Sequence, residues 1–414
     1  MNLSIKVLQA LFKDKQAVFG ANLFLYGGNI MEFTLNEEQK MVKEMAKRFS
    51  DEEIAPYARE NDIEEKFPHG ILKKMAPLGL MGATVPAAYG GAGLDFISEA
   101  IIFEEVGRGC SSVRTIISVQ MSLVELSILK RGTEEQKQKY LPRLCSAELL
   151  GSFALTEPDA GSDAASIKTT AYKKGDGWVL NGSKTWISTG DIADISIVFA
   201  RTDPQAGKKG VTAFIVEKGA PGFSSKEIKG KLGLRAADTA ELFFEDCFVP
   251  QKNILGAPGD GLKIALAALD NGRYGVAAGC VGIMQGCVDA CVKYSKERHQ
   301  FGRPIASFQL VQDMIARMYV DLTAARLLTY RAGDLKNKGI RNTLETSVAK
   351  YFASEAAVRA ATDAIQIHGA YGYSNEYPVE RYMRDAKVAT IYEGTSQIQK
   401  LIIGEHLLEI KAFV

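Results

Sequence analysis

The sequence changes its pattern twice, from helix to strand and back to helix, and this succession limits the folds available to the chain. Between residues 31 and 151, and again between 261 and 414, apolar residues recur every three or four positions, as on one face of a helix. Between 152 and 260, short β-branched and aromatic runs alternate with turn residues. A parallel doubly wound sheet would instead require strands and helices to alternate. The order predicts an α+β fold with an all-α N-terminal domain, a middle β domain and an α-helical C-terminal domain.

Two glycine-containing segments within the strand region are predicted to form hairpin turns. One is 174–177 and the other is Asn181-Gly182. In the C-terminal region, the alanine-rich stretch 347–367 predicts a helix that ends at Gly369.

The first helix of the N-terminal region is predicted to begin near Thr34, because Glu37 and Glu38 follow at the positions where acidic residues favour a helix start. Apolar residues at Met41 and Met45 are then expected on its buried face.

The composition excludes some classes of function. Fifty basic against 49 acidic residues give a net charge of +1, which offers no general attraction for nucleic acid or for an anionic membrane. Hydrophobic residues make up 46% of the chain, as in ordinary soluble proteins, and no membrane span is predicted. Six scattered cysteines, among them Cys287 and Cys291 without a nearby histidine, predict core thiols in a reducing cytoplasm and no metal site.

Residues 1–30 differ from the rest of the chain. They carry lysines and scattered apolar residues but neither a continuous apolar segment nor a small-residue cleavage site, so a signal peptide is not predicted. Met31 opens a stretch typical of a domain start. Gly27-Gly28 fits the translation of a ribosome-binding sequence just upstream of it. We therefore expect a prokaryotic protein in which 1–30 is a leader outside the fold; a targeting or partner-binding arm is the alternative.

The glycines do not form a known phosphate-binding motif. No GxGxxG opens a helix after a strand, and no GxxxxGK[ST] occurs, so neither a Rossmann nucleotide site nor a P-loop is predicted. The four histidines are dispersed and form no HExxH motif.

Three segments instead have the residues that a polar, planar ligand requires. Segment 153–163 combines small and hydroxylated residues with Pro and Gly, although it also fits an ordinary polar crossover. Segment 184–188 places Trp186 beside hydroxyl donors, and a core tryptophan is the alternative. Segment 392–399 places Glu393 ahead of Gly-Thr-Ser, where capping of the following helix is the alternative role.

In this order and separation, the three segments resemble the acyl-CoA dehydrogenase family, and the resemblance covers essentially the whole chain from Met31 onward. Further matches follow in the same order along the chain, at 89–91, 231–235, 243–246, 249–250, 298–302, 308–309 and 366–369. The resemblance implies that the middle domain is β-barrel-like and that the C-terminal domain is a four-helix bundle.

The resemblance also implies FAD, held between the β domain and the C-terminal helices, with a neighbouring subunit contacting the ADP half. The residues matched to cofactor contacts are Phe153, Leu155, Thr156, Gly161, Ser162, Trp186, Ser188, Arg298, Phe301, Gln309, Gln366, Gly369, Thr395 and Gln397. Among them Trp186 would stack on the isoalloxazine, Ser188 would lie near its reactive edge, and Arg298 would meet the pyrophosphate. An exposed ion pair is the alternative for Arg298.

Glu393 matches the catalytic base of the family. The α-protons of a thioester are weakly acidic, so their removal requires a positioned base of raised pKa in a dry pocket. Some branches carry this glutamate at the position that is Gly272 here. The resemblance places Asp270, Arg273 and Ser162 on the CoA side of the site.

The substrate class is expected to depend on the segment 105–123. Arg114 and Thr115 are similar to the glutaryl-CoA dehydrogenase branch, where an arginine pairs with a distal carboxylate, and Tyr392 is expected among the substrate contacts. The alternative is an Arg114 that pairs with an internal carboxylate. Where decarboxylating members carry a glutamate, this chain has Gly107, which leaves decarboxylation open and admits benzylsuccinyl-type thioesters.

The resemblance thus implies an enzyme that forms a 2-enoyl-CoA from a short acyl-CoA, a homotetramer whose electrons pass to an electron-transfer flavoprotein. The alternatives are a plain short-chain acyl-CoA dehydrogenase, an oxygen-using acyl-CoA oxidase, and a non-catalytic flavoprotein of the same fold.

Overall fold

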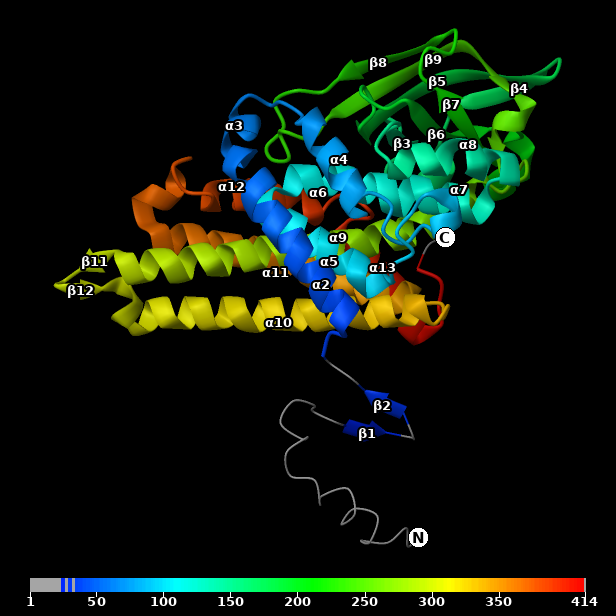
Figure 1. Cartoon of the computed structure of the whole chain (residues 1–414). Coiled ribbons are helices and arrows are strands. Elements are labelled where there is room, and N and C mark those ends of the chain that lie inside the picture. The colour runs from blue at the N-terminus through cyan, green and yellow to red at the C-terminus, as the bar shows by residue number, and fades with distance from the viewer. Residues whose placement is uncertain (1–23, 27–28, 32–33, 413–414) are drawn as a thin grey trace, which may run out of the picture.

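The computed structural model describes residues 24–26, 29–31 and 34–412. The expectation about the leader 1–30 therefore falls mainly outside the described residues, and it stays a prediction. Strands β1 (Phe24–Tyr26) and β2 (Asn29–Met31) pair with each other in antiparallel fashion, apart from the helical body (Figure 1). Met31 is therefore a strand residue, and the first helix of the body begins later.

The N-terminal region is helical, as expected, and its helices cover one side of the C-terminal helices (Figure 1). Helix α2 packs on α5, and α5 packs on the long C-terminal helix α9 (Gly261–Glu297). The elements are α2 (Glu37–Phe49), α3 (Ala58–Ile63), α4 (His69–Met75), α5 (Phe96–Gly109), α6 (Ser111–Ser118), the π-helical turn η5 (Val119–Glu125), α7 (Leu126–Arg131) and α8 (Glu134–Cys145).

The start of α2 differs from the prediction. Asn36, rather than Thr34, caps the helix: its side chain accepts the N–H of Gln39, whose own side chain accepts the N–H of Asn36. The buried face consequently includes Val42, while Met41 is 69% exposed. The expectation that Met41 is buried was wrong, because several apolar residues close together allowed more than one helical face.

The middle region is an eight-stranded sheet, in which the path β10-β7-β6-β4-β5-β9-β8 is extended by β3 pairing with β6. Strands β4 and β6 meet through one residue pair, while residues from β5, β6, β7 and β9 fill a common core. The sheet therefore curves around its own interior. The strands are β3 (Gly151–Ala154), β4 (Thr170–Lys174), β5 (Gly177–Ser188), β6 (Ile195–Arg201), β7 (Val211–Glu217), β8 (Phe223–Glu227), β9 (Thr239–Pro250) and β10 (Ile254–Leu255).

One of the two predicted hairpin turns is confirmed. Gly175 and Asp176 connect the antiparallel strands β4 and β5. The prediction for Asn181-Gly182 was wrong, because both residues lie inside β5, where its register against β9 shifts. Asn181 exchanges hydrogen bonds with Asp246 of β9 at this point, so the Asn-Gly pair marks a bulge instead of a chain reversal.

The C-terminal region consists of long helices that lie side by side (Figure 1). The alanine-rich helix α11 ends where predicted, with Gly369 at φ +61°. The elements are α9 (Gly261–Glu297), β11 (His299–Gln300), β12 (Arg303–Pro304), α10 (Gln309–Asn337), α11 (Thr343–His368), the 3-10 turn η10 (Gly369–Tyr373), α12 (Val379–Ala389) and α13 (Ser396–Leu408).

All six cysteines are reduced and buried, which confirms the prediction of core thiols. Cys287 and Cys291 lie on the face of α9 that packs into the C-terminal core. In the described part of the chain, no group of histidine, cysteine and acidic residues is arranged to hold a metal ion.

Two helical stretches, Ser111–Arg131 and Gly261–Glu297, are long and apolar enough to cross a membrane. Because 94% and 78% of these windows are buried inside the protein, they behave as core helices.

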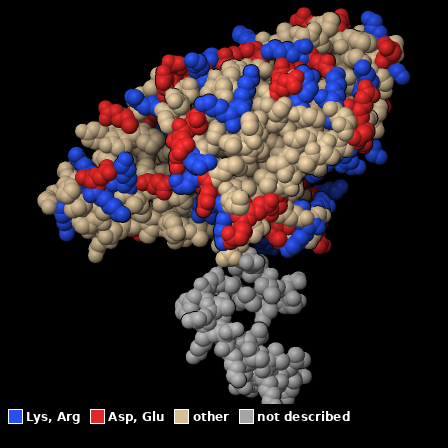
Figure 2. Space-filling view, in the orientation of Figure 1, with Lys and Arg blue, Asp and Glu red and all other residues tan. Residues whose placement is uncertain are grey.

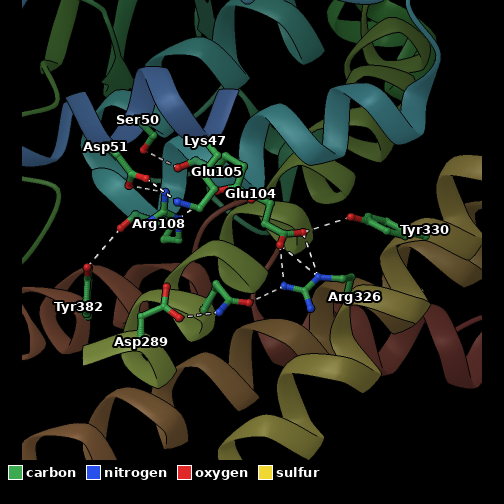
Figure 3. Close-up of polar contacts among 11 residues, drawn as sticks. Lys47, Ser50, Asp51, Glu104, Glu105, Arg108, Asp289, Arg326, Tyr330 and Tyr382 are labelled. Atoms are coloured by element: carbon green, nitrogen blue, oxygen red, sulfur yellow. Dashed lines mark hydrogen bonds and ion pairs between the residues drawn. The ribbon is translucent and has the colours of Figure 1, made fainter. Parts of the chain in front are cut away.

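A buried polar network joins the N-terminal and C-terminal helices (Figure 3). Glu104 of α5, 2% exposed, accepts hydrogen bonds from Arg326 of α10 at 2.6 Å and from Tyr330 at 3.3 Å. Arg108, one turn further along α5, pairs with Asp51 at 2.6 Å, and its carbonyl accepts a hydrogen bond from Tyr382 of α12. Helix α5 is thus held on both sides by charge-assisted hydrogen bonds.

The surface charges agree with the near-neutral composition. Basic and acidic side chains are interspersed over the face visible in Figure 2, among large areas of uncharged residues. This face offers no extended basic surface for a polyanion.

Candidate active site

Glu393 lies in the short connection between α12 and α13, in a strained backbone conformation. Its φ is +54° and that of Gly394 is +85°, so two successive residues adopt the left-handed region. Thr395 is the N-cap of α13, where its hydroxyl accepts the N–H of Ile398. The alternative that Glu393 caps this helix was therefore wrong. Strain of this kind persists only where surrounding contacts impose it, and it is typical of functional sites.

The carboxylate of Glu393 lies against α9 at Gly272, where the helix carries no side chain. A Cβ atom at Gly272 would come within 2.5 Å of the carboxyl carbon. The Oε2 atom of Glu393 is buried and has no hydrogen-bond partner in the described protein. Burial raises the pKa of Glu393 to about 7, against the opposing effects of Arg273, Lys350 and Arg114. The Glu393 carboxyl can therefore gain or lose a proton near neutral pH.

Three side chains hold the two strained peptide units by their carbonyl oxygens. Arg273 of α9 donates its Nε to the Glu393 carbonyl at 3.2 Å. The Gln399 amide donates to the carbonyls of Glu393 and Gly394 at 3.1 and 2.9 Å. Lys350 of α11, fully buried, donates its ammonium to the Gly394 carbonyl at 2.8 Å. We refer to Arg273, Lys350 and Gln399 as the carbonyl clamp.

Lys350 and Gln399 were not anticipated from the sequence. A usable signal for Lys350 was present, because it is a single charged residue inside the otherwise apolar stretch 348–353 of a helix. A lysine in such a position is rarely buried without a specific partner. Gln399 carried no comparable signal.

Arg114 is buried next to Tyr392 and has no internal carboxylate partner. Its guanidinium donates to the Tyr392 hydroxyl at 2.6 Å, and its Nε is buried without a partner in the described chain. Among the ion pairs of the described residues, none includes Arg114, so the alternative of an internal ion pair was wrong. The lack of a Cβ at Gly279 makes room for the guanidinium, since that atom would lie 2.4 Å from Nε.

The remaining residues expected on the substrate side are Asp270, Thr115 and Ser162, and each has different surroundings. Asp270 accepts hydrogen bonds from Arg273 at 2.7 Å and from Thr343 at 2.9 Å, so it is joined to the carbonyl clamp. Thr115 donates to the Ser111 carbonyl within α6 and lies near Tyr392. Ser162 is exposed on the loop after β3, and no contact links it to Glu393.

A second surface has the properties that an isoalloxazine ring requires. Trp186 is 61% exposed near the C-terminal end of the inner strand β5, with φ +59°, so the alternative of a core tryptophan was wrong. Thr156 lies beside it, because its carbonyl accepts the N–H of Thr185, and the hydroxyl-bearing Ser188 is also partly exposed. An exposed ring face with adjacent hydroxyl donors fits the expected FAD. Phe153 and Leu155 are buried, so they could face this surface only through their backbone.

The two motif segments that form this surface are joined by an ion pair between Lys184 and Glu157, both buried. Lys184 Nζ lies 2.7 Å from the Glu157 carboxylate and 3.1 Å from the Leu155 carbonyl. Burial lowers the pKa of Lys184 to about 8, while Glu157 opposes that effect. The same carboxylate accepts the backbone N–H groups of Lys168 and Thr169. The part of segment 153–163 around Glu157 is therefore tied to β5 by buried contacts.

The residues expected around the ADP half of FAD lie at the opposite end of α9. Arg298 follows the last residue of α9, 26 residues after Gly272, which corresponds to about 39 Å of helix. The side chains in this group are exposed: Arg298, Phe301, Gln309 and Gln366, together with Gly369. Phe301, 92% exposed, forms the tip of the β11–β12 hairpin that projects from the body (Figure 1). Arg298 lies over the ring of Tyr371, and none of the described ion pairs includes it.

Gly161 is exposed in the loop after β3, Thr395 lies directly after the strained turn, and Gln397 is exposed in the first turn of α13. Within one chain, the residues expected around the isoalloxazine form one region and those around Glu393 form another. The residues expected around the ADP half of FAD lie near neither region.

Comparison with known proteins identifies the fold. Three family models match the chain in order: the acyl-CoA dehydrogenase N-terminal domain over residues 36–148, the middle domain over 152–247 and the C-terminal domain over 259–408. An acyl-CoA dehydrogenase of Bacillus subtilis is 49% identical, over 90% of this chain and 99% of its own length. A glutaryl-CoA dehydrogenase of Desulfococcus multivorans is 44% identical, over 92% and 99%.

Solved structures agree with these relatives. Butyryl-CoA dehydrogenase of Megasphaera elsdenii has a TM-score of 0.89 at 42% identity, over 91% of this chain and all of that one. A glutaryl-CoA dehydrogenase of Mycobacterium smegmatis in complex with FADH2 has a TM-score of 0.88 at 33% identity, over 92% and 97%. The N-terminal helices, the central sheet and the C-terminal helices all have counterparts there, and the surface around Trp186 fits the cofactor. The chain therefore belongs to the acyl-CoA dehydrogenase family of FAD-dependent oxidoreductases.

Proposed function

We propose that this enzyme converts a short acyl-CoA into the corresponding trans-2-enoyl-CoA, with Glu393 as the catalytic base. The observation that carries the proposal is the buried, unpartnered Oε2 atom of a carboxyl whose pKa is raised to about 7. A carboxyl of this pKa is ionised in a large fraction of molecules near neutral pH and is still basic enough to take a proton from carbon.

In this reaction Glu393 accepts the α-proton of the thioester at its free carboxylate oxygen. FAD, when bound, accepts the hydride that leaves the β-carbon. The C–H bonds at Cα and Cβ break, a double bond forms between these carbons, and the two electrons leave with the hydride. The carbonyl clamp keeps the carboxylate in place, and the backbone N–H of Glu393 is available to the developing negative charge on the thioester oxygen.

For the acyl group, we propose a dicarboxylic mono-thioester, with glutaryl-CoA first and a benzylsuccinyl-type CoA next. The support is the buried Arg114, whose Nε has no hydrogen-bond partner in the described chain and whose guanidinium donates to the neutral Tyr392 hydroxyl. The Glu393 carboxylate is near enough to feel the charge of Arg114 but makes no ion pair with it, so a carboxylate on the substrate would supply a direct counter-charge to the buried guanidinium. Decarboxylating members carry a glutamate where this chain has Gly107, and a Cβ atom there would lie 3.1 Å from the Gly279 carbonyl oxygen and 3.4 Å from the Arg114 side chain. Loss of CO2 is therefore not part of the proposal.

The experiment is anaerobic flavin reduction with a panel of acyl-CoA thioesters, combined with mass determination of the products. The proposal expects glutaryl-CoA to bleach the flavin faster than butyryl-CoA does, and the product to lack two hydrogens. A preference for butyryl-CoA would make the enzyme a plain short-chain acyl-CoA dehydrogenase. Rapid formation of peroxide in air would favour an oxidase.

We further propose that the active unit is a homotetramer in which FAD contacts two subunits, and that an electron-transfer flavoprotein receives its electrons in the cytoplasm. The separation between Gly272 and Arg298 along α9 supports the shared cofactor. Helix α10 also exposes apolar side chains that a partner subunit would cover, among them Leu310, Tyr319 and Val320. Sedimentation analysis of the holoenzyme tests the tetramer, and reoxidation of the reduced enzyme by purified electron-transfer flavoprotein tests the acceptor.

A further inference from the structure

We propose that Lys350 is a positioning residue for the base: it holds the strained Glu393–Gly394 turn by the Gly394 carbonyl and supplies a positive charge that keeps Glu393 ionised. This proposal rests on the proposed role of Glu393 as the base. Lys350 is on α11, has no exposed surface, and places its Nζ 2.8 Å from the Gly394 carbonyl oxygen.

The backbone conformation of Glu393 and Gly394 requires side chains that hold it in place. Two successive left-handed residues, one of them not glycine, form a turn that would relax unless contacts imposed it. The clamp residues approach the turn from different elements, Arg273 from α9, Lys350 from α11 and Gln399 from α13. Because the donors come from three separate helices, the turn is held in position relative to the C-terminal core as a whole.

The charge on Lys350 distinguishes it from Gln399. The groups that act on Glu393 come from several elements: Arg273 and Asp270 on α9, Lys350 on α11 and Arg114 on α6. The three cations lower the pKa of Glu393, against burial and against Asp270, which raise it.

Lys350 is itself surrounded by groups from three segments. These are Cys280 and Arg273 of α9, Glu355 of its own helix, and Glu393. Burial lowers the pKa of Lys350 to about 8, while Cys280, Glu393 and Glu355 favour its charged form. At neutral pH the ammonium is thus the dominant form, and it donates to the carbonyl.

The test separates charge from position with two variants. Lys350→Gln keeps a donor but removes the charge, and Lys350→Met removes both. We expect both to shift the acid limb of the flavin-reduction rate upward by about one pH unit, because a nearby cation has been lost. Lys350→Met should in addition lower the alkaline plateau by about tenfold, because the turn loses one of its holding contacts. The probes are butyryl-CoA and glutaryl-CoA.

Gln399→Leu is the matched control, since it removes two hydrogen bonds to the same carbonyls without changing charge. It should lower the rate at every pH and leave the midpoint of the acid limb unchanged. The protonation of Glu393 is read independently of turnover as the carboxylic-acid infrared band that Glu393→Gln lacks. That band should titrate at higher pH in both Lys350 variants.

The proposal is overturned if FAD-replete Lys350→Gln shows the wild-type acid limb and the wild-type infrared titration. Should Lys350→Met fail to fold, Lys350→Gln carries the test by itself. Failure of the proposed function is a different result: Glu393→Gln would then reduce its flavin at the wild-type rate, whatever the Lys350 variants do.

Discussion

In the proposed function, the buried charge of Arg114 selects the acyl group of the substrate. A guanidinium that donates one hydrogen bond to Tyr392 and leaves its Nε unpartnered retains most of its capacity for a bidentate carboxylate contact. The same property makes the site unfavourable for a purely apolar acyl chain, because that chain would leave the charge uncompensated.

Replacing Arg114 with Met should therefore reverse the preference between substrates. We expect the ratio of kcat/KM for glutaryl-CoA over butyryl-CoA to fall by about 100-fold or more, because a charge-assisted contact is lost and an apolar surface is gained. Steady-state kinetics on both thioesters measure the ratio. Tyr392→Phe is the control: it removes the hydroxyl but keeps the guanidinium, so the preference should persist. An unchanged ratio in Arg114→Met would show that Arg114 does not contact the acyl group.

The sequence indicated Glu393, Arg114 and Trp186 because their types and order form a specific pattern. For Lys350 the sequence offered only the signal of one charge in an apolar helical stretch, and its role depends on a contact with a turn 44 residues away in the chain. Gln399 carried no signal. The conformation of the turn was equally inaccessible, because positive φ at a glutamate has no local sequence signature.

At the scale of elements, α5 is the helix through which the N-terminal region docks on the C-terminal helices. Its Glu104 is buried and neutralised by Arg326, while Arg108 connects it to the π-helical turn Ser50–Ile54 after α2 and to α12 (Figure 3). Such a network specifies how the regions fit together, since each buried charge requires its partner.

Arg326→Met should destabilise the protein by about 3 kcal/mol, because it leaves the Glu104 carboxylate buried without its cation. Denaturant unfolding of the holoenzyme measures the change. Lys338→Met is the matched control, since it breaks an exposed pair with Asp334 on the same helix and should cost well under about 1 kcal/mol. Equal effects of the two variants would contradict the role given to the network.

A second buried acidic group lies between α5 and the π-helical turn η5. Both carboxylate oxygens of Glu125 are buried without a partner in the described protein, and burial together with the nearby Glu99 holds its pKa well above the usual value. A raised folded-state pKa means that the folded protein binds a proton which the unfolded chain has already released, so stability is lost as pH rises above about 4.5.

Glu125→Gln removes this titration. We expect the variant to be more stable than the wild type at pH 8 and similar to it at pH 5. Each tenfold difference between the acid dissociation constants of the folded and unfolded states should add about 1.4 kcal/mol to the gain in free energy of unfolding at pH 8. Thermal unfolding at the two pH values measures the difference. A stability difference that does not change with pH would show that Glu125 is not buried in its protonated form.

The elements that the sequence predicted correctly were those whose local sequence fits only one structure. The helix ending at Gly369 and the turn at Gly175-Asp176 were confirmed. Asn181-Gly182 was misread because the same dipeptide suits a hairpin and a bulge, and only the pairing of β5 with β9 decides between them.

At the scale of the whole molecule, the two halves of the expected cofactor site lie far apart on one chain. Glu393 lies beside Gly272 in the first half of α9, while Arg298 and Phe301 extend from the C-terminal end of that helix. A site completed by a second copy of the chain accounts for both the distance and the exposure of the hairpin.

This arrangement predicts complementation between two inactive variants. Arg298→Glu and Glu393→Gln, each inactive when expressed alone, should recover about one quarter of the wild-type activity when co-expressed in equal amounts. Half of the subunit pairs would be mixed, and one of the two sites in each mixed pair would have both native residues. No recovery in mixed assemblies would show that each FAD is held by a single chain.

The central claim is that Glu393 removes the α-proton, and rapid anaerobic mixing of FAD-replete enzyme with glutaryl-CoA and with butyryl-CoA tests it most directly. For the wild type, we expect flavin bleaching whose rate falls as pH decreases through about 7, since the base must be ionised. Glu393→Gln should keep its FAD and lose at least about 1000-fold in that rate. Bleaching of Glu393→Gln at the wild-type rate would contradict the account.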